Sequence, residues 1–252
     1  ILKMGDLTTQ PVDVIINAAN PSCLGGGGVD GAIHRAAGHS LYEKCLAIPT
    51  VLVRGNPKVR CPTGSAVLTK GPFGPQLTPT HVIHAVGPRI TAGTSPTRKE
   101  REDLFRCHEM SFNIANREGY QSIALPAISC GIYGFPIDFA ATLAVRAVNQ
   151  HCMQATSLES ISFLFAEERC YDAFHSAVSR ANFDLVMGPS ASMTTDAPIH
   201  ERRSNPEKTP LDSSFRETEV STSASPMEAW TDEDEDEKSS RSSRSSSTSS
   251  AS

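Results

Sequence analysis

The sequence predicts an α/β domain, in which helices cover both faces of a central sheet, followed by a disordered tail. Three observations carry this prediction. Short apolar runs alternate with amphipathic stretches as far as about residue 185, the intervening stretches are long enough to be crossover helices, and the apolar periodicity stops near Gly188. The length of 252 residues suits one globular domain plus additional chain.

Apolar runs bounded by turn residues predict five strands, and stretches with helical spacing predict four helices. The expected strands are Val12–Asn20, Gly64–Gly71, His81–Val86, Ser122–Ser129 and Ser160–Phe165. The expected helices are Gly28–Gly38, which ends at a glycine, Thr97–Arg117, Pro136–His151 and Glu167–Arg180. The sequence also starts without Met and almost at once in strand-like residues, so we interpret it as a fragment of a larger protein that could lack an initial strand.

The formal charge of −5 is distributed unevenly. Residues 1–185 hold 16 Lys and Arg against 15 Asp and Glu, whereas residues 186–252 hold 7 against 13. A nearly neutral domain does not favour nucleic-acid binding through phosphate neutralisation. No apolar run approaches the ~20 residues of a membrane helix, so we expect no membrane association.

Seven scattered cysteines, never spaced as C-x-x-C, favour a reducing compartment and argue against a disulfide framework and a structural zinc site. From residue 186 onward, Ser, Thr, Pro and charged residues predominate. An acidic run spans Asp232–Glu237, and Ser239–Ser252 is almost entirely serine. Such segments bury too little to offset their ordering entropy, so we predict a disordered, solvated tail.

The first glycine loop follows the strand that ends near Asn20. Four consecutive glycines, Gly25–Gly28, lead directly into a helix, and bare N–H groups at a helix N-terminus favour phosphate. Neither a Gly-Lys-Ser/Thr sequence nor a G-x-G-x-x-G fingerprint is present, which removes the usual basis for predicting ATP hydrolysis or hydride transfer. The loop is therefore interpreted as a phosphate cradle, with a merely flexible loop as the alternative.

The second glycine loop, Leu125–Pro136, also leads from a strand into a helix. Two such loops at strand ends predict one ligand held from both sides. The aromatic ring of Tyr133 suits packing against a sugar or base. Cys130 has no histidine placed by the sequence to activate it, so we do not expect a catalytic thiol.

Six segments carry a resemblance to a known family. They are GDLTT (Gly5–Thr9), VDVIINAAN (Val12–Asn20), LGGGGVDGAIHRAAG (Leu24–Gly38), CPTGSAVLTKG (Cys61–Gly71), HVIHAVGP (His81–Pro88) and SIALPAISCGIYGFP (Ser122–Pro136). In this order they closely resemble a macrodomain, and most strongly the MacroD-type branch of ADP-ribosyl hydrolases. The resemblance spans about residues 3–181.

The resemblance implies a three-layer α/β/α macrodomain with a mixed central sheet and a cleft for ADP-ribose. It implies that Asp6 accepts the adenine amino group, that two loops hold the diphosphate, and that Tyr133 lies beside the distal ribose. A weaker match places Phe165 beside the adenine. The implied ligand-binding residues are Asp6, Leu7, Gly26, Gly27, Gly28, Val29, Ser129, Cys130, Gly131, Ile132 and Tyr133. Cys130 stands where the family usually has Thr, and its contact is expected through the backbone amide.

Asn20 and Asp30 are the catalytic residues that the resemblance implies. Asn20 would contact the distal ribose through its amide, its alternative role being that of a turn residue before Pro21. Asp30 would orient the attacking water, and its place at a helix start favours the ionised form; alternatively it is an ordinary first-turn aspartate. Asp13 is expected to be a surface carboxylate, and the histidines that the sequence singles out, His34, His81 and His84, are expected to serve core or surface roles.

Three functions remain open at this point. The first is hydrolysis of mono-ADP-ribose esters on Asp or Glu of proteins, with O-acetyl-ADP-ribose as a second substrate. The second is a non-catalytic reader of ADP-ribosylated partners, and the third is RNA or poly(ADP-ribose) binding. We expect no cofactor and no metal, a monomer, and a cytoplasmic location, which is the host cytoplasm for a viral protein, with the nucleus as the alternative. We expect a viral polyprotein as the parent, with a multidomain cellular protein as the alternative.

Overall fold

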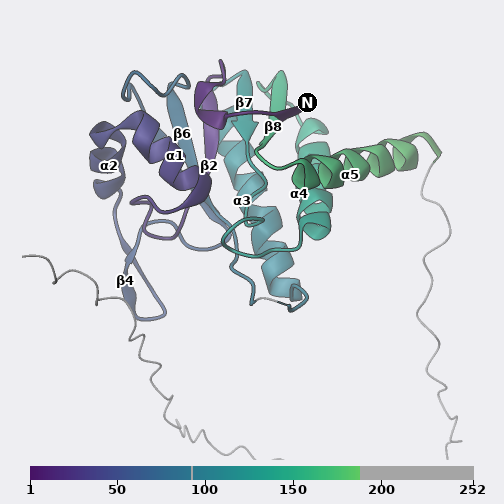
Figure 1. Cartoon of the computed structure of the whole chain (residues 1–252), viewed down its shortest axis with the longest axis horizontal. Helices are drawn as coiled ribbons and strands as arrows, with labels where there is room; N and C mark the ends of the chain where they lie inside the picture. Colours follow the sequence, from purple (N-terminus) through teal and green to yellow (C-terminus); the bar gives the residue numbers. More distant parts are fainter. Residues whose placement is uncertain (92, 188–252) are drawn as a thin grey trace, which may run out of the picture. The chain divides into compact units, whose positions relative to one another are not determined.

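The structure, a computed structural model, describes residues 1–91 and 93–187. The tail predicted for residues 186–252 therefore lies, apart from its first two residues, outside the described residues. Within the described part, a six-stranded sheet has the order β1-β8-β7-β2-β6-β5, and a separate hairpin pairs β3 with β4 (Figure 1). The strands are β1 Leu2–Met4, β2 Val14–Ala18, β3 Val51–Val53, β4 Asn56–Val59, β5 Ser65–Lys70, β6 His81–Val86, β7 Ser122–Leu125 and β8 Ser160–Phe165.

The sheet is mixed, as expected. β1, β8, β7, β2 and β6 run parallel to their neighbours, and β5 pairs antiparallel with β6 at the edge. The carboxyl ends of the central parallel strands therefore lie at one edge of the sheet. The helices that connect them are η1 Leu7–Thr9, α1 Gly28–Ala37, α2 His39–Leu46, α3 Arg98–Arg117, α4 Ile137–Cys152 and α5 Glu168–Met187.

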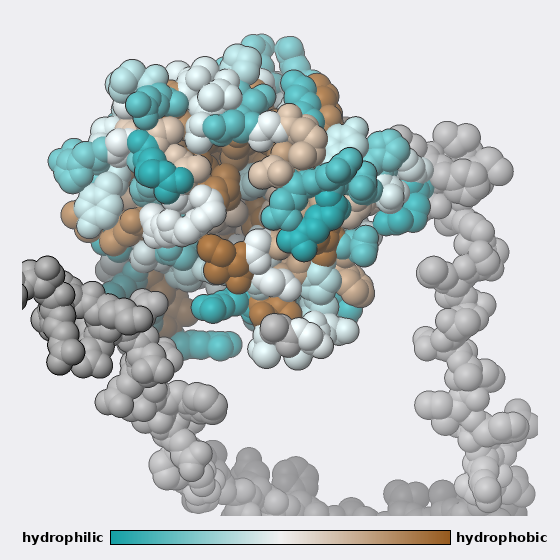
Figure 2. Space-filling view, in the orientation of Figure 1, coloured by the Kyte–Doolittle hydropathy of each residue, from teal (hydrophilic) through white to brown (hydrophobic). Residues whose placement is uncertain are grey.

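Helices cover both faces of this sheet, which confirms the three-layer prediction (Figure 1). Side chains alternate along β2, so that Val14 and Ile16 pack with α3, α4 and α5, whereas Ile15 packs with α1 and α2. Both groups of side chains are fully buried. No helix of the described residues combines the length and apolar character needed to cross a bilayer. On the face in Figure 2, polar residues predominate at the periphery and apolar residues are visible near the middle.

The five expected strands do not include β1, the four expected helices do not include η1, and further elements differ from the prediction. The strand expected over Ser122–Ser129 ends at Leu125, because Pro126 has no N–H to donate to a ladder. The short helix α2 and the β3–β4 hairpin were not predicted. Helix α2 directly follows α1 after Gly38, whose φ of +69° allows the chain to change direction there.

Asp13 is not the plain surface carboxylate that the sequence suggests. Its Oδ2 accepts hydrogen bonds from Gln121 N (2.9 Å), Ser122 N (2.8 Å) and Ser122 Oγ (2.9 Å), joining the start of β2 to the start of β7. Burial alone would raise the pKa of Asp13, but the hydrogen bonds from Ser122 and Gln121 outweigh it and lower the pKa. The ionised carboxylate therefore stabilises this strand pair.

We expect Asp13→Ala to lower the free energy of unfolding by about 2 kcal/mol at pH 7, because hydrogen bonds to a charged acceptor are lost. A lowered folded-state pKa contributes stability above the unfolded pKa that is lost as the pH falls through the folded pKa. Urea denaturation should therefore show the difference from wild type shrinking in acid. Asp172→Ala, on an exposed turn of α5, is the control and should change stability by less than about 0.5 kcal/mol. A loss of unfolding free energy in Asp13→Ala that is the same at pH 7 and in acid would contradict this role of the Asp13 carboxylate.

Candidate active site

The first glycine loop connects β2 to α1 and presents unbonded backbone amides. Gly27 is the N-cap of α1 and has no side chain to cap it. Within the described residues, the N–H groups of Gly26 to Asp30 have no hydrogen-bond acceptor, whereas the next amide, Gly31 N, bonds to Gly27 O. The first turn of α1 thus directs free donors and the positive end of the helix dipole at one place.

The second glycine loop is a compact turn between β7 and α4. Phe135 N bonds to Ser129 O (2.9 Å), Gly134 N bonds to Gly131 O (2.9 Å), and Ile90 N bonds to Tyr133 O (2.8 Å). These bonds leave the N–H groups of Gly131, Ile132 and Tyr133 without an acceptor among the described residues. The loop therefore presents three consecutive free donors.

Cys130 departs from the expectation that its backbone amide holds a ligand. Its N–H already bonds to Ala127 O at 3.2 Å, so the free donors begin one residue later. Burial raises the pKa of the Cys130 thiol to about 12, so the thiolate needed for nucleophilic attack is scarce. The prediction that Cys130 is not a catalytic thiol is consistent with this burial.

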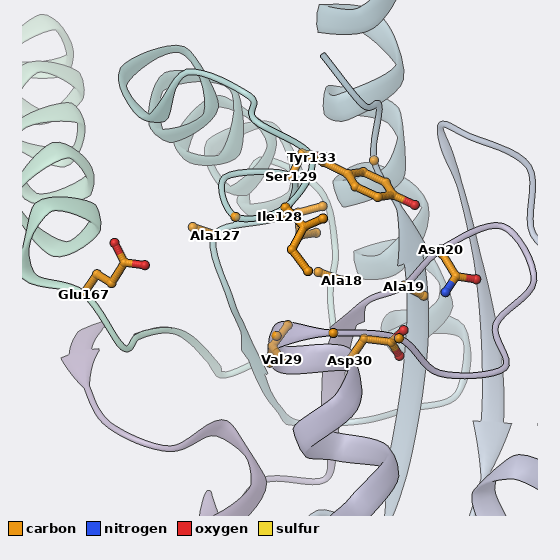
Figure 3. A pocket seen from close by; sticks show the side chains of 16 residues that line it. Ala18, Ala19, Asn20, Val29, Asp30, Ala127, Ile128, Ser129, Tyr133 and Glu167 are labelled. Atoms are coloured by element: carbon orange, nitrogen blue, oxygen red, sulfur yellow. The ribbon is translucent and has the colours of Figure 1, made fainter. Parts of the chain in front are cut away.

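Both loops line one cavity of about 470 Å³. Ile132 of the second loop crosses toward the first, where its Cδ1 lies 2.8 Å from the point at which a Cβ on Gly27 would lie. Figure 3 shows Asn20 and Asp30 at one end of the cavity with the Tyr133 ring above, and Glu167 at the other end. The cavity is lined by Ala18, Ala19, Asn20, Gly26–Asp30, Gly87, Ala127–Ser129, Gly131–Tyr133 and Glu167.

A second cavity of about 650 Å³ adjoins the first and shares five lining residues with it. The shared residues are Gly28, Val29, Ala127, Gly131 and Glu167. Asp6 and Leu7 line the second cavity, and so does Phe165, whose ring packs in the core against Phe174 at a centroid distance of 4.8 Å. Asp6 Oδ1 caps η1 by accepting from Thr8 N and Thr8 Oγ1, both at 2.8 Å, which leaves Oδ2 available. No Lys or Arg of the described chain lines either cavity.

Asn20 and Asp30 converge above Gly26. A Cβ on Gly26 would lie 3.0 Å from Asp30 Oδ2 and 3.2 Å from Asn20 Nδ2, so any side chain there would push both groups aside by a few tenths of an ångström. Asn20 Nδ2 donates to Gly25 O (2.8 Å), and Asn20 Oδ1 accepts from Ser22 N and Ser22 Oγ. Of the two N–H bonds of the amide, one therefore holds the loop and the other is available to a ligand.

Asp30 is more buried than its place at a helix start suggests. It is 3% exposed, and its Oδ1 accepts from Asn17 Nδ2 at 2.7 Å. Burial raises the pKa of Asp30, and the Asn17 hydrogen bond and the nearby His34 ring oppose that rise. The helix start was expected to favour the ionised form; in the structure burial works against that form, and the hydrogen bond from Asn17 supports it, with His34 Nε2 3.5 Å from Oδ1.

Comparison with known proteins identifies the family. The model of the Macro domain matches residues 16–144, which is half of the chain. The chain belongs to the macrodomain family. A macro domain-containing protein of Xanthomonas campestris is 45% identical over 175 residues, covering 69% of this chain and 92% of the relative. A protein of Citrobacter rodentium named O-acetyl-ADP-ribose deacetylase is 44% identical over 168 residues, covering 67% of this chain and 85% of the relative.

Solved structures show the same fold. The Oceanobacillus iheyensis macrodomain with ADP has a TM-score of 0.63 at 34% identity, covering 73% of this chain and 91% of that one. Other structures of that protein carry alanine in place of an asparagine and of an aspartate ten positions apart. The Trypanosoma brucei macrodomain in complex with ADP-ribose has a TM-score of 0.59 at 32% identity, covering 70% of this chain and 68% of that one. The curated relatives named above are bacterial and give no support to a viral parent protein.

Sequence reasoning did not assign Asn17, His34 or Glu167 to the macrodomain site. Asn17, the first Asn of the NAAN motif, holds Asp30, and its own partner is His84 Nδ1 at 3.1 Å. His34 was expected to be a packing residue, but one helical turn brings it beside Asp30. Glu167 lines both cavities. The spacing of Asp30 and His34 by four residues on one helix was a signal that could have been used.

His34, Cys45 and His84 of this macrodomain bring side-chain nitrogen and sulfur atoms within 4.8 Å of one another. Both ring nitrogens of His84 are already engaged, Nδ1 with Asn17 and Nε2 with Thr69 Oγ1 at 2.9 Å. The sulfur of Cys45 lies 3.4 Å from the same Nε2. The arrangement is therefore a hydrogen-bonded network that supports Asp30.

A substitution at Gly31, in the first turn of α1, can show how tightly the first glycine loop packs against this helix. A Cβ there would lie 2.5 Å from Gly26 O, which is backbone. Overpacking costs about 1–3 kcal/mol, against a gain of roughly 0.5–1 kcal/mol from replacing glycine inside a helix. We therefore expect Gly31→Ala to lower the unfolding free energy by about 1–2 kcal/mol in urea denaturation.

The matched control is Gly131→Ala, since a Cβ at Gly131 meets nothing within 4 Å. Its stability should stay within about 0.5 kcal/mol of wild type. Equal stability of the two variants would show that the first loop is not clamped against α1.

Proposed function

We propose that this macrodomain binds ADP-ribose and hydrolyses esters formed at its distal ribose. The proposed substrates are proteins that carry mono-ADP-ribose on Asp or Glu, together with O-acetyl-ADP-ribose. One observation carries the proposal: two runs of free backbone amides and the pair Asn20 and Asp30 line the same cavity. The Citrobacter rodentium relative, named as an O-acetyl-ADP-ribose deacetylase, supports an ester as substrate.

The proposed binding mode places the diphosphate between the two loops. Each helix-end amide contributes only about 0.3–1 kcal/mol to an anion, so donors from both loops are needed when no cationic side chain lines the cavity. The adenosine would occupy the second cavity, with its amino group on Asp6 Oδ2. The distal ribose would then lie at the end marked by Asn20, Asp30 and Tyr133, whose phenol has a pKa raised by burial and so stays protonated as a hydrogen-bond donor.

Asp30 is the proposed general base. Asp30 Oδ2 lies on the side of Gly26 and Asn20, while Oδ1 is held by Asn17. The carboxylate would take a proton from water as that water attacks the ester carbonyl. The acyl–oxygen bond then breaks, the ribose oxygen is protonated, and a carboxylic acid and a free ribose hydroxyl are released. General-base assistance of this kind is worth roughly 10²–10⁴ in rate.

The spacing of the two residues supports their assignment. Asn20 and Asp30 are ten positions apart, as are the asparagine and aspartate replaced in the Oceanobacillus iheyensis variants. The same cleft would also serve a reader that binds ADP-ribosylated partners without cleaving them. Turnover alone separates the enzyme from the reader. RNA or poly(ADP-ribose) binding would instead show affinity that falls steeply with salt.

The function is tested by incubating the macrodomain with a protein mono-ADP-ribosylated on Glu or Asp, and separately with O-acetyl-ADP-ribose. Release of ADP-ribose from the protein and of acetate from the small molecule is expected. Retention of the label by the protein, with intact ADP-ribose binding in calorimetry, would support a reader and contradict the enzyme.

For Asp30→Ala we expect kcat to fall by about 10²-fold or more, since the general base is removed, while the Kd for ADP-ribose changes by less than about threefold. The rate of wild type should rise with pH through the pKa of Asp30, because only the carboxylate accepts a proton. Burial raises that pKa, so the rise should lie above the range of an ordinary aspartate. Asp138→Ala, on the surface of α4, is the control, and equal rates for Asp30→Ala and wild type would remove Asp30 from the mechanism.

For Asp6→Asn we expect ADP-ribose to bind about 10-fold more weakly, because a charged acceptor for the adenine amino group is lost. Asparagine can still cap η1, so the fold should be unaffected. Calorimetry with inosine diphosphate ribose, in which a C6 carbonyl replaces the amino group, should show no loss of affinity for the variant relative to wild type, because the Asn amide can donate to that carbonyl. A tenfold loss for both ligands would mean that Asp6 does not contact the amino group.

A further inference from the structure

A row of polar side chains crosses the otherwise apolar layer between the sheet and α1 and α2. Asn17 on β2 is the register partner of His84 on the adjacent strand β6, and Thr69 on β5 lies beside His84. Asn17 and His84 are fully buried, and Thr69 is 4% exposed. Polar groups in such a layer are costly unless each finds a hydrogen-bond partner, so their arrangement needs a physical reason.

The hydrogen bonds of this row have one consistent direction. Thr69 Oγ1 donates to the backbone oxygen of Val82 (3.2 Å), which leaves its lone pairs for an N–H of His84 Nε2 (2.9 Å). With the proton on Nε2, His84 Nδ1 is an acceptor for Asn17 Nδ2 (3.1 Å). The second N–H of the same amide goes to Asp30 Oδ1 (2.7 Å).

This arrangement leaves Asn17 Oδ1 buried without a hydrogen-bond partner among the described residues. The unpaired oxygen of Asn17 costs free energy, and in return the Asn17 nitrogen donates hydrogen bonds to both His84 and Asp30. The flipped amide would place oxygen against the carboxylate, which only a protonated Asp30 tolerates. The tautomer of His84 decides between these two arrangements. The acceptor oxygen of Thr69, the shorter contact of Nε2, favours a proton on Nε2, and that N–H also faces Cys45 Sγ at 3.4 Å.

We propose that His84, held by Thr69, is a positioning residue for Asp30 that acts by fixing which end of the Asn17 amide faces the carboxylate. The role in turnover rests on the proposed function, whereas the effect on the carboxylate does not. His84 does not line either cavity and has no contact with the proposed ligand. Burial lowers its pKa to about 3, which agrees with a neutral ring whose tautomer persists at working pH.

Other titratable groups also face Asp30. His34 approaches from α1, and burial lowers its pKa. The thiols of Cys23 and Cys45 and the Tyr133 phenol also interact with the Asp30 charge. Their pKa values are all raised, that of Cys45 to about 12, so these three groups are neutral at working pH. If a substitution of His84 changes the pKa of Asp30, the change must therefore act through the hydrogen bond from Asn17 or through the nearby His34 ring.

The test compares His84→Leu with His84→Asn. Leu and Asn have nearly the same branched shape, but only Asn places an acceptor oxygen close to the position of His84 Nδ1. In His84→Leu we expect kcat to fall about tenfold, which is less than the full loss of general-base assistance because Asp30 itself is still present. KM should stay within about threefold of wild type. The acidic limb of the pH–rate profile should move to higher pH, and His84→Asn should recover both quantities in large part. Combined with Asp30→Ala, His84→Leu should cause no further loss of kcat.

A readout independent of turnover is the titration of the Asp30 carboxyl carbon by NMR, with ¹³C-labelled aspartate. The midpoint should rise in His84→Leu and stay near wild type in His84→Asn. The matched control is His108→Leu, since His108 is equally buried but lies in α3 on the other face of the sheet, where Nδ1 contacts Leu104 O. It should lower stability without moving the Asp30 midpoint.

If His84→Leu does not fold, Thr69→Val is compared with Thr69→Ser, because only serine keeps the hydroxyl that His84 Nε2 needs. The midpoint of the Asp30 titration should rise in Thr69→Val, as in His84→Leu, and should stay near wild type in Thr69→Ser. An Asp30 midpoint that is equal in wild type, His84→Leu and Thr69→Val would overturn the proposal. A shifted midpoint in a protein without turnover would retain the positioning role and contradict the proposed function instead.

Discussion

Backbone N–H groups that have no acceptor among the described residues are the feature on which the site depends. They come from the first turn of α1 and from the turn after β7, and both groups line one cavity. Two such runs side by side, one of them at a helix N-terminus, form a site already shaped for the oxygens of an anion. Among the described residues no Lys or Arg lines the cavity, so these amides are its main donors for a diphosphate.

The sheet order creates this juxtaposition. β2 and β7 are parallel neighbours, so the loops that leave their carboxyl ends meet at the same edge of the sheet. Small residues then allow close approach: Gly26 leaves room for Asp30 and Asn20, and Gly31 lets α1 pack against the Gly26 carbonyl. Binding and chemistry are thus coupled through the same loop, since the residues that hold the anion also position the carboxylate.

Local patterns in the sequence predicted the parts whose signal is local. Helix α3 begins as expected at Thr97, where a capping box with Glu100 satisfies the first amides, and α1 ends at Gly38. The two glycine loops were recognised in the same way, whereas the Asn20–Asp30 pair was assigned only through the resemblance to the macrodomain family. The hydrogen bond that Asp30 receives from Asn17 was not predictable, because Asn17 and its own partner His84 lie on two different strands and meet only through the sheet register. Likewise, the Cys130 amide is used within its own turn, which no motif reveals.

The most direct test is an NMR titration of ¹⁵N-labelled protein with ADP-ribose. The amide signals of Gly26–Val29 and of Gly131–Tyr133 should move together, in the direction expected for new hydrogen bonds, and saturate with a single dissociation constant. Movement of only one of the two groups, or movement confined to Lys and Arg side chains elsewhere, would contradict the claim that paired backbone loops hold the diphosphate.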